Sequence, residues 1–307
     1  MLDYPRFGST KRINTMSGNP RQPEDESLET VGSLAEVSTS IWSRRYRFVR
    51  ELREAGMARI LLVECASDSL PVCLKFLNSK TCSRTLEQEC RALMRLRHPA
   101  IVSLLDFSFE DTPPWLATEY ISGHTLQTHL RENPQLSLEA IIEILKALLD
   151  ALAYSHDQNV IHRDLKPANL MIDLTSGVQL RILDFGLAII DNFDHEGNLT
   201  AEDADVAGTL TYMAPEQLEG QRLSTACDLY AVGLMGWEML MGRSLFKDKA
   251  IQRTVLEKMR HTEGFPLGDP SESIPEPLKG FVQDCTRLDP LTRPTARTGI
   301  AVLASLS

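Results

Sequence analysis

Three short polar motifs in the second half of the chain contain residue types that could carry phosphoryl chemistry. His162–Asn169 reads His-Arg-Asp-Leu-Lys-Pro-Ala-Asn, Asp184-Phe-Gly186 begins fifteen residues after Asn169, and Ala214-Pro-Glu216 follows. When negative charge spreads over phosphate oxygens, catalysis depends mainly on positioning and electrostatic stabilisation. Oxygen ligands such as carboxylates suit Mg²⁺. Any one of these residues alone would fit a cap or a surface charge, whereas the ordered set favours a chemical site.

In these motifs the sequence resembles the eukaryotic-type protein kinase family, over about residues 46 to 305, and its Lys-Pro-Ala-Asn-Leu-Met stretch is similar to bacterial members. The resemblance implies that Asp164 accepts or orients the proton of the attacking hydroxyl and that Lys166 lies near the γ-phosphate of ATP. It also implies that Asn169 and Asp184 hold the Mg²⁺ ions. Three further residues are implied to be architectural, namely Phe185, Glu216 and Arg293.

A lysine earlier in the chain would complete the implied phosphate site. Val72-Cys-Leu-Lys75 matches the family's Val-Ala-Ile-Lys strand, so Lys75 would contact the α- and β-phosphates and pair with a helix glutamate. Glu87 and Glu89 compete for that role. We favour Glu89, because the family places this glutamate about nine residues before a His-Pro pair such as His98-Pro99. An unpaired buried ammonium would be costly, so one of the two carboxylates should face it.

The resemblance also implies where the base of the nucleotide would bind. Thr118 would be the gatekeeper, and backbone groups of Glu119 and Ile121 would hydrogen-bond to adenine. The side chains on the faces of adenine would be Ile60, Cys73 and Met171. Plain core packing explains these apolar residues equally well, and the two interpretations are compatible.

The glycine-rich loop departs from the family pattern Gly-x-Gly-x-x-Gly. Aligned on Ile60, the chain has Arg53, Ala55 and Ala58 at the glycine positions, which leaves Gly56 as the glycine of this cofactor-binding loop. Glycine matters there because it lets backbone amides approach phosphate closely.

This departure keeps three classes of function open. They are an active protein kinase, a kinase-like scaffold that binds nucleotide weakly or not at all, and a small-molecule phosphotransferase. We favour the active kinase, because the implied catalytic residues are intact and the Ala-Pro-Glu segment is present.

Substrate type and regulation are implied by the same region. The lysine of His-Arg-Asp-Leu-Lys-Pro and the stretch Gly208–Tyr212 resemble the serine/threonine branch, in which Thr209 would hydrogen-bond toward the catalytic aspartate and lysine. Phosphorylation of Thr200, or the acids Glu202 and Asp203 in its place, would order the loop against Arg163. Autophosphorylation is therefore expected.

Apolar periodicity predicts the elements that position these residues. A hairpin, a helix and two more strands are expected in the first part of the chain. Their ranges are 59–64 and 71–76 with a turn at 66–69, then the helix at 85–97, and strands at 101–109 and 115–120. After Gly123 helices dominate. They are one that begins after the N-cap Ser137, one at 226–241, and others in the last fifty residues.

These elements predict an α+β, two-lobed protein-kinase fold. The expected divisions are a disordered or weakly ordered leader at 1–43, a five-stranded N-lobe with one key helix at 44–120, a hinge at 118–123, and a mainly helical C-lobe at 124–307.

Composition limits the partners and the compartment. The net charge of −10 disfavours nucleic acid or an anionic membrane and suits a basic protein segment. The six cysteines form neither a zinc pattern nor a disulfide framework, and no stretch reaches the length of a membrane span. We expect a cytoplasmic kinase that uses ATP and Mg²⁺ on protein substrates, in an oligomeric state that the sequence does not indicate.

Overall fold

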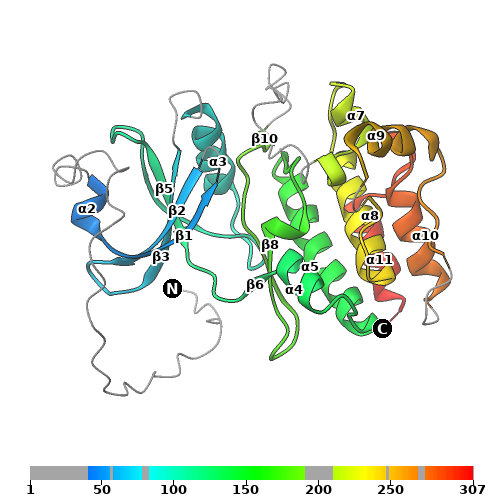
Figure 1. The fold of residues 1–307 in the computed structure, drawn as a ribbon, viewed down its shortest axis with the longest axis horizontal. Helices are drawn as coiled ribbons and strands as arrows, with labels where there is room; N and C mark the ends of the chain where they lie inside the picture. The colour runs from blue at the N-terminus through cyan, green and yellow to red at the C-terminus, as the bar shows by residue number, and fades with distance from the viewer. Residues whose placement is uncertain are drawn as a thin grey trace.

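The computed structural model describes residues 41–55, 58–77, 83–190, 210–246, 249–268 and 274–306. Within these residues the chain forms a β-rich N-lobe and a mainly helical C-lobe, which lie at opposite ends of the long axis in Figure 1. The predicted α+β, two-lobed fold is confirmed. Among these residues, no helix combines the length and hydropathy that a membrane crossing requires.

The N-lobe is built on a five-stranded antiparallel sheet with the order β1-β2-β3-β5-β4. Its elements are α2 (Ile41–Arg45), β1 (Tyr46–Ala55), β2 (Ala58–Cys65), β3 (Pro71–Leu77), α3 (Ser83–Arg95), β4 (Leu104–Ser108) and β5 (Trp115–Glu119). On one face of the sheet, alternate apolar side chains of β2, β3 and β5 form a small core. On the other face, Leu86 and Cys90 of α3 pack with Leu116 of β5. Helix α3 is thereby held against the strand that leads to the hinge.

The hairpin predicted at Ala66–Ser69 is present. The Cys65 N–H donates to the Leu70 carbonyl at 2.9 Å, and Asp68 accepts from the Leu70 N–H at 3.1 Å. Of the predicted leader, residues 41–43 lie in α2, and residues 1–40 lie outside the described part of the chain.

Two predicted elements have bounds that differ by two residues or more from those in the structure. Helix α3 runs from Ser83 to Arg95, not from 85 to 97, because the chain turns before the His-Pro pair, where proline disfavours helix in the residue before it. Strand β4 begins at Leu104 and not at 101, because Ile101 and Val102 pair with Ile182 of the C-lobe instead of with β5. These two buried residues connect the lobes.

The C-lobe contains short strands beside the N-lobe and helices farther away (Figure 1). Its elements are β6 (His124–Thr125), α4 (Leu126–Glu132), α5 (Leu138–Asp157), β7 (Val160–Ile161), η2 (Pro167–Asn169), β8 (Leu170–Asp173), β9 (Gln179–Ile182), β10 (Ile189–Ile190), α7 (Pro215–Leu218), α8 (Ala226–Met241), α9 (Ile251–Arg260), α10 (Glu276–Cys285), η3 (Pro290–Thr292) and α11 (Ala296–Ala304). Strands β6, β8 and β9 form one small sheet, and β7 and β10 form another.

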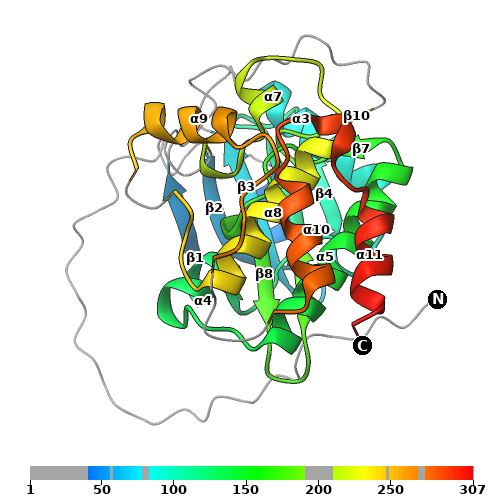
Figure 2. The same cartoon turned by 90° about the vertical axis from the view of Figure 1, so that its right-hand side faces the viewer.

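Helix α8 is the centre of the C-lobe and has the predicted bounds 226–241. Helices α5 and α10 pack against it, as the view in Figure 2 shows. The close approach of α10 depends on Gly233, where an added Cβ would lie 2.6 Å from the Cβ of Cys285. Helix α5 begins as predicted, because the Ser137 hydroxyl accepts from the Ala140 N–H.

Candidate active site

An ion-paired lysine connects the two lobes of the candidate site. Lys75 on β3 places its Nζ 2.7 Å from Oε2 of Glu89 on α3 and 3.1 Å from Oδ1 of Asp184, which follows β9. Glu87, the alternative partner, pairs with Arg91 on the surface of α3 instead. The strand lysine, the helix glutamate and the aspartate after β9 therefore meet in one charged cluster.

Burial and charge act against each other in this cluster. Burial raises the pKa of Glu89, and the ammonium of Lys75 opposes that effect. Burial also opposes the ionised form of Asp184, but Lys75 and the Gly186 N–H outweigh it and lower the pKa of Asp184 to about 2. Asp184 is thus a carboxylate at neutral pH. For Lys75, burial is outweighed by the two carboxylates, which raise its pKa.

Gly186 is needed beside this cluster. Its N–H donates to Oδ1 of Asp184 at 2.9 Å. A Cβ at this position would lie 3.0 Å from the same oxygen and 3.6 Å from Oε2 of Glu89. A side chain here would crowd the Asp184 oxygen, so the glycine of Asp184-Phe-Gly186 has a local steric reason.

Residues 162–169 between β7 and β8, here called the catalytic loop, bring together the other implied residues. The Lys166 ammonium lies 2.8 Å from Oδ2 of Asp164, and Nδ2 of Asn169 donates to the Asp164 carbonyl at 2.8 Å and to Oδ2 at 3.1 Å. The Asn169 carbonyl accepts from the Leu183 N–H at 2.9 Å, one residue before Asp184. This backbone bond couples the catalytic loop to the aspartate after β9.

A buried aspartate that sequence reasoning missed holds the catalytic loop in place. Asp228 on α8 is fully buried and accepts from the N–H groups of His162 and Arg163, each at 2.9 Å, and from the His156 ring at 2.8 Å. Arg163 has a left-handed backbone with φ of +70°. Such a conformation costs on the order of 1 kcal/mol or more in a non-glycine residue. The two bonds to Asp228 offset that strain next to Asp164.

The oxygen atoms left over at Asn169 and Asp184 fit a hard cation. The side-chain nitrogen of Asn169 donates both of its hydrogen bonds to Asp164, so the side-chain oxygen of Asn169 points away from Asp164. One carboxylate oxygen of Asp184 binds Lys75 and Gly186. No hydrogen bond to the Asn169 side-chain oxygen or to Asp184 Oδ2 occurs among the described residues. A carboxylate and an amide oxygen suit Mg²⁺.

The implied adenine-binding residues lie on neighbouring strands and just beyond them. Cys73 of β3 pairs with Thr118 of β5 in register, and Ile60 of β2 pairs with Lys75. Thr118 is 8% exposed, and Glu119 and Ile121 follow it in the connection between the lobes. On the C-lobe side, the terminal carbon of Met171 lies 3.8 Å from the position of a Cβ on Gly123, which has φ of +124°. Met171 is therefore next to the hinge.

The pairing of β1 with β2 extends into the segment aligned with the glycine-rich loop, with a register shift between Glu51 and Arg53. Strands β1 and β2 remain paired up to Ala55 and Ala58, and Arg53 is opposite Ile60. Arg59 and Glu51 form an ion pair of 3.0 Å across this hairpin. Strand pairing therefore extends through the three positions at which the family has glycines, and the register shift lies just before the first of them.

Several residues that the sequence analysis named lie outside the described part of the chain. They are Gly56, Thr200, Glu202, Asp203 and Thr209. Their implied roles stay predictions.

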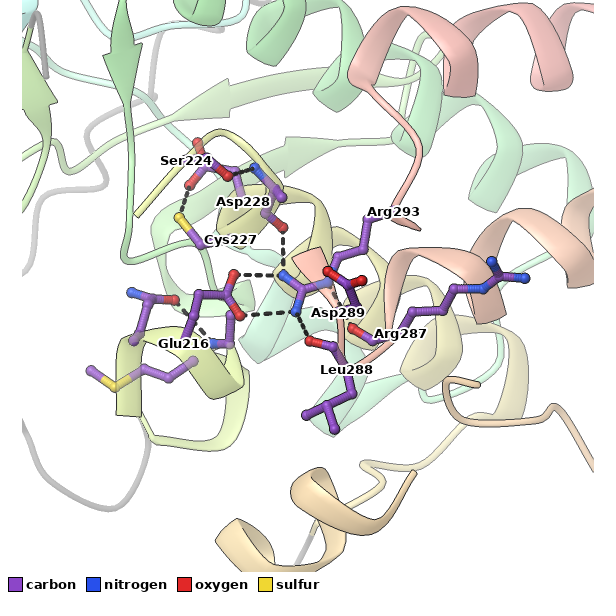
Figure 3. Close-up of polar contacts among 12 residues, drawn as sticks. Glu216, Ser224, Cys227, Asp228, Arg287, Leu288, Asp289 and Arg293 are labelled. Atoms are coloured by element: carbon purple, nitrogen blue, oxygen red, sulfur yellow. Dashed lines mark hydrogen bonds and ion pairs between the residues drawn. The ribbon is translucent and has the colours of Figure 1, made fainter. Parts of the chain in front are cut away.

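Glu216 and Arg293, which the resemblance implied to be architectural, form a fully buried ion pair. Two guanidinium nitrogens of Arg293 lie 2.6 and 2.9 Å from the two carboxylate oxygens of Glu216. The side chain of Arg293 is 0% exposed and that of Glu216 is 3% exposed. Figure 3 shows Arg293 facing Glu216, with Arg287 and Leu288 close to the same side chain. The pair joins α7 to the segment before α11. Phe185 is also buried and packs its ring 4.5 Å from that of His162.

Sequence reasoning also missed two residues that support the segment after the catalytic site. Gln217 donates to the Arg163 carbonyl at 2.9 Å, and the buried Lys258 donates to three carbonyls just before Ala214. The available signal was weak, because each is a single polar residue in a helix. Asp228 would have been the clearest indicator of a supporting residue, because it is a charged residue within an apolar helical stretch.

The fold and this arrangement of side chains agree with the two-lobed protein-kinase fold that the sequence predicted. A protein kinase domain profile matches residues 46–302, and the chain belongs to that family. It is 28% identical over 257 residues to the serine/threonine-protein kinase PrkC of Bacillus subtilis (strain 168), covering 82% of this chain and 38% of that protein. The serine/threonine-protein kinases pkn3 and pkn2 of Myxococcus xanthus are 34% and 33% identical, over 67% and 73% of this chain.

The chain spans well under half of the length of these relatives, since the matches cover 38%, 40% and 27% of them. What is shared is therefore the kinase domain.

Proposed function

We propose that this chain is a serine/threonine protein kinase that transfers the γ-phosphoryl group of Mg·ATP to serine or threonine hydroxyls of proteins, including its own. One observation carries the proposal: the charged cluster of Lys75, Glu89 and Asp184 and the catalytic loop with Asp164 are linked through the Asn169–Leu183 backbone bond. Kinase names among the relatives support it.

Each of these residues has a chemical task in that reaction. Lys75, held by Glu89, would contact the α- and β-phosphates. Asp164 would orient the acceptor hydroxyl and take its proton, while Lys166 would neutralise charge on the transferring group. Mg²⁺ bound by Asn169 and Asp184 would supply further positive charge at the phosphates.

The acceptor and the location follow from weaker observations. The net charge of −10 favours a protein acceptor with a basic segment. The cysteine pattern, which contains no disulfide framework, supports a cytoplasmic location.

The test compares the wild-type chain with Asp164→Asn. Wild type should be stabilised thermally by ATP only with Mg²⁺ and should transfer phosphate to myelin basic protein. Asp164→Asn should keep its melting temperature within a few degrees and lose transfer by about 10³-fold or more. Asp150→Asn is the matched control, because that carboxylate is exposed on α5.

Nucleotide binding without transfer in the wild type would favour the scaffold. Undiminished transfer by Asp164→Asn would refute the role of Asp164.

A further inference from the structure

A buried lysine of the C-lobe directs all of its hydrogen-bonding capacity at one short backbone segment. Nζ of Lys258 on α9 donates to the carbonyls of Leu210, Thr211 and Met213 at 2.9, 2.8 and 2.6 Å. The residue is 1% exposed. An ammonium group has three N–H donors, so these carbonyls saturate it. A neutral amine could serve only two of them.

Several neighbours of this lysine favour its charged form, and burial acts against them. Its Nζ lies 5.4 and 5.2 Å from the ring centroids of Tyr230 and Phe246, within the range of cation–π attraction. Burial lowers the pKa of Lys258 to about 7, and the carboxylate of Glu216 opposes that shift. The rings and the carbonyls thus stabilise the proton that burial disfavours.

The segment bound by Lys258 continues directly to the catalytic loop. Tyr212 donates its hydroxyl proton to Glu238 of α8, which fixes the segment from a second helix. One residue after Met213, the Ala214 N–H donates to Oε1 of Gln217 at 3.0 Å. The same amide of Gln217 donates to the carbonyl of Arg163, the residue before Asp164. A displacement of residues 210–213 would therefore reach the catalytic aspartate through two hydrogen bonds of one side chain.

We propose that Lys258 is a positioning residue for the protein acceptor, because it fixes residues 210–213, which are connected through Gln217 to the residue before Asp164. The inference rests on the proposed function and adds a determinant of acceptor binding on α9. Lys258 touches none of the reacting groups, so its effect is transmitted by the backbone of that segment.

The experiment compares Lys258→Met and Lys258→Arg with wild type in transfer to myelin basic protein. Lys258→Met removes the donors at similar volume and should raise the KM for the acceptor about tenfold or more. The KM for ATP should stay within about twofold, because other residues build that site. Hydrogen exchange of residues 210–213 should be faster in Lys258→Met. Arg253→Met is the matched control, since Arg253 is exposed on the same helix.

Lys258→Arg keeps the charge and the N–H donors, but a planar guanidinium does not fit three converging carbonyls as well as an ammonium group does. The acceptor KM of Lys258→Arg should therefore rise, but less than that of Lys258→Met. Either a wild-type acceptor KM or wild-type exchange of residues 210–213 in Lys258→Met would overturn the inference. If Lys258→Met fails to fold, a wild-type acceptor KM in Lys258→Arg overturns it. Hydrogen exchange also separates the two proposals, because it can be measured without phosphate transfer. If the wild type transfers no phosphate, the proposed function fails. If exchange of residues 210–213 is unchanged in Lys258→Met, the proposed role of Lys258 fails.

Discussion

The buried pair of Arg293 and Glu216 allows a quantitative prediction for Arg293→Met. Arg293 places all five of its N–H groups: two go to Glu216, and the others go to the carbonyls of Ala226, Arg287 and Leu288 at 3.0, 2.7 and 3.0 Å. Methionine keeps much of the apolar stem but has no donor. The carboxylate of Glu216 and three carbonyls would then be buried without this partner.

The magnitude follows from those groups. Removing one member of a buried ion pair costs about 3 kcal/mol at the low end. Each carbonyl that loses its donor adds about 1 kcal/mol. The free energy of unfolding should therefore fall by about 6 kcal/mol, which at about 2 °C per kcal/mol for a chain of this size lowers the melting temperature by about 12 °C.

The assay is reversible urea unfolding of wild type, Arg293→Met, Glu216→Leu and the double variant. The double variant should be more stable than the sum of the two single changes by about 2 kcal/mol or more, because it leaves neither charge unpaired. Arg297→Met is the control, since Arg297 and Asp157 form an exposed pair that should contribute less than about 1 kcal/mol. A melting temperature for Arg293→Met within about 3 °C of wild type, or additive single changes, would refute the reasoning.

Two other predictions concern the charged cluster and a buried histidine. Lys75→Met should reduce phosphate transfer by about 10² or more, because Glu89 and Asp184 lose their shared cation; Glu87→Gln is the control, and equal losses in steady-state assays of the two would contradict this role. Burial lowers the pKa of His162 from its ordinary 6.5, and Asp228 opposes that shift. Below about pH 6.5 the ring therefore binds a proton in the unfolded chain more readily than in the folded chain, so stability falls as the pH drops. His162→Phe should make the decline in melting temperature between about pH 7 and pH 5 shallower, and an identical slope would show that this ring does not contribute.

Much of the N-lobe could be predicted because its strands are short and alternate. The hairpin at Ala66–Ser69 has turn residues. The pairing of Lys75 with Glu89 followed from the family resemblance, which places this glutamate about nine residues before a His-Pro pair such as His98-Pro99. The start of β4 could not be predicted, because Ile101 is apolar and β-branched whether it pairs with β5 or with Ile182 of the other lobe. Local pattern does not distinguish two partners that both bury the same side chain.

The supports of the catalytic loop were harder to predict than its motifs. The order and spacing of His162–Asn169 and Asp184-Phe-Gly186 carry information in the sequence itself. Asp228 and Lys258 act on backbone groups that lie 65 and 45 residues or more away along the chain, so nothing nearby indicates their partners. Only the packing of α8 and α9 brings them to those segments.

The buried charged groups of the C-lobe share a physical reason for their position. Asp228, Arg293 and Lys258 each bind several backbone groups, most of them in loops or at the ends of helices. Charged side chains are the strongest partners available to such groups. Because each binds several backbone groups at once, its loss leaves all of them unsatisfied together. Changes at these residues should therefore disturb the catalytic loop more than apolar truncations of equal size elsewhere in the C-lobe.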